Sequence, residues 1–166
     1  MDANRLYDEH HESLHRYLVR LTGDADLADD ATQETFARLL ARPPRDENPR
    51  AWLFTVATNL VRGWSNKRRR RNRLLEGGAA RVPSADPPQD PASAAEAEAQ
   101  RSMVRRALAA LTDRERTILL MREEGFAHRE IASIVGTTTG SIGTMIARAL
   151  ERLAQHLPLD VEDVRS

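Results

Sequence analysis

Apolar residues recur along this chain of 166 residues at the spacings that place them on one face of a helix. The stretches with this spacing form two groups, separated by a segment rich in Pro, Gly, Ala and Ser. They cover residues 6–21, 26–40, 49–64, 103–111, 118–121, 131–135 and 142–153. The pattern predicts an all-α protein, with two small helical domains joined by a flexible linker.

Local start and stop signals set the expected boundaries. Asn48 is suited to cap a helix that begins at Pro49, and Thr112 with Glu115 forms a capping-box pattern at the start of another. The Gly and Pro residues between 77 and 91 are typical of a linker. The expected parts are a first domain over 1–73, a linker over 74–100, a second domain over 101–157 and a short acidic tail over 158–166.

The segment 126–153 has the pattern of a helix-turn-helix. A short apolar helix ends at Gly136, which can adopt the positive φ that closes a helix. Thr138 follows as the expected N-cap of a longer helix, and Ser141 lies in its first turn. A short helix, a tight turn with Gly and a second helix are the parts of this motif.

The longer helix has an apolar back and a small, polar front. Its back consists of Ile142, Met145, Ile146, Ala149, Leu150 and Leu153. Its front consists of Thr139, Ser141, Thr144, Ala147, Arg148 and Arg152. Such a front suits a helix that enters the major groove of DNA. An ordinary helical hairpin in a bundle is the alternative interpretation, because turn chemistry alone does not establish DNA binding.

The net charge is zero, but the charges are strongly separated along the chain. Residues 1–40 carry 4 basic and 9 acidic side chains, whereas residues 62–73 carry 7 basic and none acidic. Residues 74–100 carry 1 basic and 5 acidic, and residues 101–157 carry 9 basic and 6 acidic. This separation indicates different partners for different segments. An acidic face suits a basic protein surface, and an Arg cluster suits phosphate.

Aromatic and polar side chains precede the basic run at residues 67–71. Trp52, Phe54, Asn59 and Trp64 lie on the same expected helix as this run. Aromatic faces beside Arg and Asn are what unstacked bases bind. The simpler interpretation is that the basic run is a solvated helix end, where cations also favour the helix dipole, and that Trp52 belongs to the core.

A possible metal motif occurs near the start of the chain. His11, Glu12 and His15 match the H-E-x-x-H pattern of zinc hydrolases. No Cys and no further His occurs in the hundred residues after this motif, so a carboxylate such as Glu34 would have to be the third ligand. We therefore keep a zinc hydrolase only as a remote alternative, and we expect no metal and no cofactor.

Composition excludes several other classes. The chain has no Cys, so it has no disulfide framework and no Cys-based zinc site. No apolar run reaches the length of a membrane span, and the acidic start does not resemble a signal peptide. We expect a cytoplasmic protein without membrane insertion.

The ordered set of motifs resembles the extracytoplasmic-function (ECF) sigma factors of bacterial RNA polymerase, which belong to the sigma-70 family. The first-domain motifs that carry the resemblance are Ala28-Asp29-Asp30, Gln33-Glu34-Thr35-Phe36, Asn48-Pro49-Arg50-Ala51-Trp52-Leu53 and Ala57-Thr58-Asn59-Leu60, followed by the Arg run. Those of the second domain are Leu111-Thr112, Arg114-Glu115-Arg116, Glu130-Ile131-Ala132, Gly136 and Arg148-Ala149. The match covers nearly all of residues 5–157.

The resemblance implies a role for each part. The first domain would be sigma region 2, and the second would be region 4. Binding of core RNA polymerase, through the clamp of its beta-prime subunit, would use Asp29, Asp30, Gln33, Glu34 and Phe36. Recognition and opening of the -10 promoter element would use Asn59, Arg62, Lys67, Arg68, Arg69, Arg70 and Arg71. Contacts with the -35 element would come from Thr138, Thr139, Ser141, Thr144 and Arg148.

The resemblance also implies partners and the absence of catalysis. The partners would be core RNA polymerase, including its beta subunit, promoter DNA and, as in many such proteins, an anti-sigma factor. The chain would be a transcription initiation factor with no catalytic residues of its own. It departs from the family pattern at Gly63, where an Asp is usual, and at Gly143, where a Lys is usual. A free-standing, dimeric helix-turn-helix regulator is the main alternative function.

Overall fold

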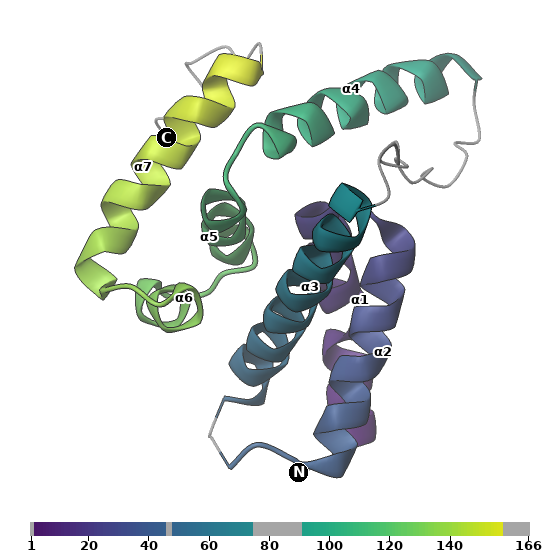
Figure 1. Ribbon diagram of the computed structural model, residues 1–166, viewed down its shortest axis with the longest axis vertical. Helices are drawn as coiled ribbons and strands as arrows, with labels where there is room; N and C mark the ends of the chain where they lie inside the picture. Colours follow the sequence, from purple (N-terminus) through teal and green to yellow (C-terminus); the bar gives the residue numbers. More distant parts are fainter. Residues whose placement is uncertain (1, 46–47, 75–90, 158–166) are drawn as a thin grey trace. The chain divides into compact units, whose positions relative to one another are not determined.

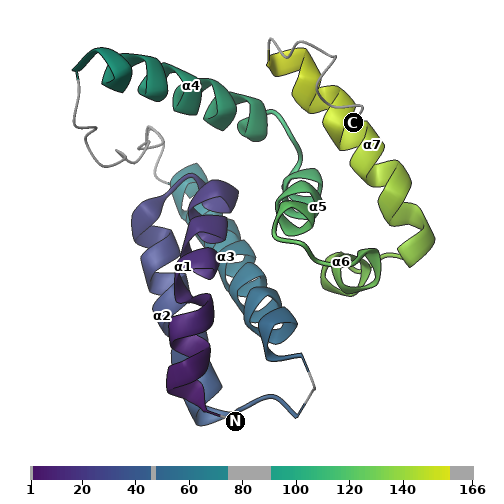
Figure 2. The same ribbon diagram turned by 180° about the vertical axis from the view of Figure 1, so that it is seen from behind.

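The computed structural model describes residues 2–45, 48–74 and 91–157, and every regular element within these ranges is a helix (Figures 1 and 2). The helices are α1 (Ala3–Thr22), α2 (Ala25–Ala41), α3 (Pro49–Leu74), α4 (Pro91–Ala109), α5 (Asp113–Glu123), α6 (His128–Val135) and α7 (Thr139–His156). The chain divides into two compact units, residues 1–84 and 85–166. The predicted all-α fold with two helical domains is confirmed.

Helix α4 begins at Pro91, inside the segment that the sequence pattern assigned to the linker. Its first half is rich in Ala and Glu, which favour helix strongly, and a Pro is well tolerated at a helix start. Glu98 pairs with Arg105 Nη2 at 2.6 Å and with Arg101 Nη1 at 3.5 Å along the same helix. The rest of the predicted linker, residues 75–90, and the predicted tail, 158–166, lie outside the described residues.

The first unit is a three-helix arrangement in which α1, α2 and α3 each pack against the other two (Figures 1 and 2). Its core side chains come from all three helices: Leu14, Tyr17, Leu18, Ala28, Ala31, Leu39, Leu53, Phe54, Ala57 and Val61. The Tyr17 hydroxyl lies 2.9 Å from Thr58 Oγ1, which itself donates to the Phe54 carbonyl. Tyr17 therefore donates to Thr58, and this buried bond ties α1 to α3.

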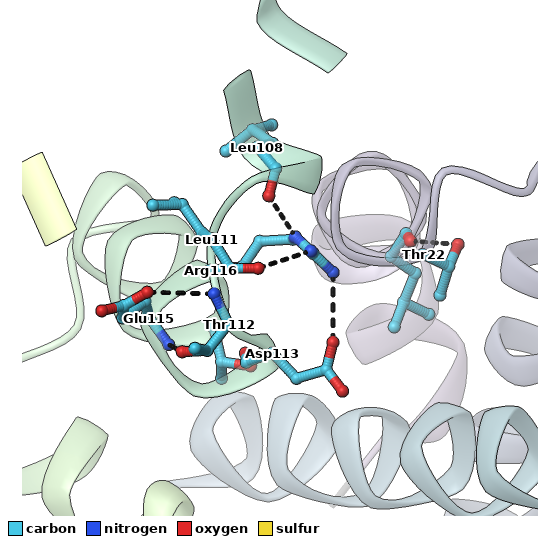
Figure 3. Close-up of polar contacts among 9 residues, drawn as sticks. Thr22, Leu108, Leu111, Thr112, Asp113, Glu115 and Arg116 are labelled. Atoms are coloured by element: carbon cyan, nitrogen blue, oxygen red, sulfur yellow. Dashed lines mark hydrogen bonds and ion pairs between the residues drawn. The ribbon is translucent and has the colours of Figure 1, made fainter. Parts of the chain in front are cut away.

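In the second unit, a half-buried arginine lies at the junction of α4 and α5. Arg116 Nε donates to the Leu108 carbonyl at 2.8 Å, and Nη2 donates to the Leu111 carbonyl at 3.0 Å (Figure 3). The predicted capping box is confirmed beside it. The Thr112 amide donates to Glu115 Oε2 at 2.9 Å, and the Glu115 amide donates to Thr112 Oγ1 at 3.2 Å (Figure 3).

Helices α6 and α7 form the predicted helix-turn-helix. Gly136 ends α6 with φ of 69°, in the left-handed region that favours glycine. Arg114 Nη2 donates to the carbonyls of Val135 and Gly136 at 3.2 and 3.4 Å, so a side chain from α5 caps the end of α6. Thr138 occupies the N-cap of α7, but its hydroxyl pairs with Ser141 Oγ at 2.7 Å rather than with a backbone amide.

Candidate functional site

Helix α2 presents an acidic surface to solvent. The side chains of Asp29, Asp30 and Gln33 are exposed, and that of Glu34 is half-buried. Asp24 caps the helix, because its Oδ1 accepts from the Leu27 amide at 3.1 Å. The opposite face of α2, with Ala28, Ala31 and Thr35, is buried. The predicted polymerase-binding residues other than Phe36 therefore lie on one accessible face, which we call the α2 surface.

Phe36 does not lie on the α2 surface. Its side chain is only 7% exposed and packs edge-on against Tyr7, with 4.9 Å between the ring centroids. Its position on α2 belongs to the less polar side of the helix, which faces α1. Phe36 therefore supports the packing of α1 on α2 and offers little contact area to a partner.

The two histidines of the H-E-x-x-H motif are involved in other contacts. His15 Nε2 lies 2.6 Å from Asp29 Oδ1, and the His11 ring lies 4.4 Å from that of Tyr7 and stacks on His15 at 6.4 Å. Glu34, the candidate third ligand, pairs with Arg38 Nε at 2.8 Å. Among the described residues, no three metal-ligating side chains come together. The geometry does not favour the zinc hydrolase.

Helix α3 carries the predicted basic residues on one continuous helix. Asn59 is exposed and Arg62 is half-buried. The side chains of Lys67, Arg68, Arg69, Arg70 and Arg71 are all exposed. At 3.6 residues per turn, Asn59, Arg62 and Arg70 point to the same side of the helix, whereas Arg68 lies about 180° from Asn59. We call the side of α3 that carries Asn59, Arg62 and Arg70 the α3 surface.

Arg68 is held by an ion pair within the first unit. Its Nη1 lies 2.6 Å from Asp24 Oδ2, with side-chain exposures of 59% for Arg68 and 21% for Asp24. Burial acts to raise the pKa of Asp24, but hydrogen bonds from Arg68 and from the Leu27 amide hold it below its usual value. Sequence reasoning missed this partner of Arg68, because Asp24 lies 44 positions earlier in the chain.

The aromatic residues of α3 divide into three environments. Phe54 is fully buried, and the Arg50 guanidinium lies 5.3 Å from its ring centroid. Trp52 is half-buried rather than a core residue. Around the axis of α3, its direction differs from that of Asn59 by only about 20°, so the two residues lie on the same side of the helix. Trp64, also half-buried, lines an open hollow with residues of α2. The aromatic residues therefore do not form one common platform.

Helix α7 presents the predicted polar front. Thr138, Thr139, Thr144 and Arg148 are exposed, and Ser141 is half-buried. The apolar back is narrower than the pattern predicted. Ile142, Ile146 and Ala149 are buried, but Leu150 is 40% exposed. A Cβ added at Gly143 would meet no atom within 4 Å, so this glycine is not required by packing within the chain.

Known proteins match both parts of the chain. The family model for sigma-70 region 2 matches residues 6–72, and that for sigma-70 region 4 matches residues 101–153. The ECF RNA polymerase sigma factor EcfG of Rhodopseudomonas palustris is 34% identical over 153 residues, which cover 89% of this chain and 81% of that protein. The ECF sigma factor SigL of Mycobacterium tuberculosis is 33% identical over 153 residues, with coverage of 89% and 84%.

A solved structure is similar over almost the whole chain. The sigma factor RpoE from Bartonella quintana, in complex with the anti-sigma factor NepR, has a TM-score of 0.78 and 25% sequence identity. The match covers 95% of this chain and 97% of RpoE. Within the described ranges, no helix combines the length and apolar character that crossing a membrane requires. The order of the two matched regions and the similarity of full-length relatives show that the chain belongs to the ECF sigma factors of the sigma-70 family.

Proposed function

We propose that this sigma factor, which directs RNA polymerase to promoters, divides its work among the three surfaces described above. The α2 surface docks on core polymerase at the beta-prime clamp, and the second unit contacts the beta subunit. The α3 surface binds and opens the -10 element, and α7 enters the -35 major groove. The observation that supports this division best is the separation of an acidic face on α2 from a basic extension on α3.

The α2 surface is suited to a protein partner rather than DNA. Its exposed carboxylates would repel the phosphate backbone, but they attract a basic protein surface. The double variant Asp30→Arg with Gln33→Arg should abolish association with core polymerase and leave the helical content unchanged. Glu12→Arg, at an exposed position on α1, is the matched control and should associate normally. Normal association of the double variant would refute the assignment.

The α3 surface is suited to opened DNA. A basic helix end binds the backbone, and Asn59 can hydrogen-bond to the edge of an unstacked base. Asn59→Ala should therefore impair formation of the open complex more than initial promoter binding. Permanganate footprinting reports unpaired thymines. Thymine reactivity equal to that of the wild type would count against this role.

The α7 front is suited to the major groove, because its small polar side chains are exposed and its back is fixed in the core of the second unit. Contacts by Thr139, Thr144 and Arg148 would contribute to -35 recognition. Their substitution by Ala should reduce transcription from promoters with an intact -35 element. Equal transcription from such promoters would argue against this placement.

Regulation by an anti-sigma factor is part of the proposal. The similar RpoE was solved in complex with the anti-sigma factor NepR, which is a precedent for such a partner. The chain itself would supply binding and promoter opening, and the polymerase would supply the phosphodiester chemistry. A protein that co-purifies with the chain and displaces it from core polymerase would meet the definition of this partner.

A further inference from the structure

An open hollow of about 440 Å³ lies beside the α2 surface. It is lined by Asp30, Gln33, Glu34 and Ala37 from α2, and by Trp64 from α3. Ala37 is exposed and has the smallest side chain of the five lining residues. The hollow is open to solvent, so its lining is accessible to another molecule.

Trp64 lies on the other side of α3 from the α3 surface, and it shares its own side with Arg68 and Arg71 of the basic run. It lies five positions after Asn59, which places it about 140° around α3 from that side chain. Arg68 lies one turn after Trp64 on the same stripe, and it pairs with Asp24 at the start of α2. The stripe that carries Trp64 therefore runs along α2, and the indole belongs with the acidic surface.

The chemistry of the lining favours a cation. Asp30 forms no ion pair within the parts of the chain that the structure describes, and Glu34 is only partly neutralised by an exposed pair with Arg38. A carboxylate, an amide oxygen and an indole face can together bind a guanidinium group by hydrogen bonds and cation–π attraction. The same carboxylates would repel the phosphates that accompany any base.

We propose that the hollow receives an arginine side chain of the protein partner and that Trp64 is a protein-contact residue rather than a platform for bases. The partner is core polymerase, so the inference rests on the proposed function. Arginine is favoured over lysine, because its planar group can stack on an indole while donating to a carboxylate. The contact couples α3 to the docking surface of α2.

The first test fills the hollow from an exposed position. Ala37→Arg places a guanidinium of the chain itself beside Asp30 and Trp64, and it should weaken association of the full chain with core polymerase at least about ten-fold, as loss of an anchoring contact does. Ala41→Arg, at an exposed position one turn further along α2, is the matched control and should change affinity little. Equal affinities for Ala37→Arg and the wild type, or equal losses in the two variants, would overturn the inference.

The second test separates protein contact from base contact. Trp64→Ala should weaken core association, and Trp64→Phe should restore part of it, with unchanged helical content by circular dichroism. Binding of a labelled single-stranded oligonucleotide by the full chain should not change in either variant. A loss of about five-fold or more in that affinity, as expected for one lost stacking contact, would overturn the inference.

The two tests also distinguish this inference from the proposed function. If the wild-type chain fails to bind core polymerase, the proposed function itself fails. If the wild type binds and both Ala37→Arg and Trp64→Ala bind equally well, only the role of the hollow fails. Since Ala37 is exposed, the first variant keeps the test valid even where Trp64→Ala disturbs folding.

Discussion

Arg116 joins the end of α4 to the start of α5, and its removal should selectively destabilise the second unit. The side chain is only 15% exposed and donates to the carbonyls of Leu108 and Leu111 (Figure 3). Arg116→Met preserves much of the apolar stem but removes both donors. Hydrogen bonds from a charged group are each worth about 1.5–3 kcal/mol.

The expected cost is about 2–4 kcal/mol, because water can partly replace the lost donors at these part-buried carbonyls. The contact between Arg116 and Asp113, at 3.4 Å, adds little because Asp113 is exposed. The stability of Arg116→Lys should lie between that of Arg116→Met and that of the wild type. Lysine keeps the charge, but it cannot donate to both carbonyls in the geometry of a guanidinium. Arg129→Met, at an exposed position on α6, is the matched control.

Urea unfolding of the full chain can resolve the affected unit. Both tryptophans, Trp52 and Trp64, lie in the first unit, so their fluorescence reports that unit, whereas circular dichroism reports all helices. Arg116→Met should lower the midpoint of the second unit by about 1–2 M urea, given the usual denaturant slopes of small domains. The tryptophan transition should not move. Unaltered dichroism curves, or equal shifts of both signals, would refute the structural role of Arg116.

Three further predictions concern DNA binding and pH. Gly143→Lys should tighten binding of the chain to -35 DNA and steepen the plot of log affinity against log salt by about 0.9, as one added phosphate contact does. Fluorescence anisotropy across a salt series measures both effects. Weaker binding by the variant would instead indicate that the backbone approaches the groove closely. Asp24→Asn keeps a good N-cap but removes the ion pair that holds Arg68. The slope of log affinity against log salt for single-stranded DNA should then steepen by about 0.7, as one added phosphate contact does. An unchanged slope would argue against the restraint of Arg68 by Asp24. Burial lowers the pKa of His10, so the unfolded chain takes up a proton first as pH falls below about 6.5, and the first unit should lose stability there. His10→Gln should flatten this dependence in urea unfolding followed by tryptophan fluorescence, and an equal pH dependence in both proteins would rule His10 out as its source.

Local signals in the sequence were sufficient to predict most of the fold. The cap at Asn48 and the turn at Gly136 depend on residues adjacent in sequence, and both were located correctly. Hydrophobic spacing also identified the buried side of α7, because the period of a helix is visible within two turns. Leu150 was the exception, since the width of a buried stripe depends on which neighbouring helices cover it.

Features that depend on distant parts of the chain were not predictable. Arg68 and Asp24 are 44 positions apart, and nothing near either residue indicates the other. The hollow beside Trp64 requires knowledge of how α2 packs along α3. Phe36 shows a different limit. The resemblance placed it among contact residues, but the helical period places it on the side of α2 that packs against Tyr7.

The central claim is that the chain gives core RNA polymerase its promoter specificity. The most direct measurement is co-purification of the chain with core polymerase, followed by sequencing of the DNA that the complex binds. The expected result is a set of promoters with shared -10 and -35 elements, recovered only when both chain and polymerase are present. Recovery of a palindromic site by the chain alone, as a dimer and without polymerase, would contradict the claim.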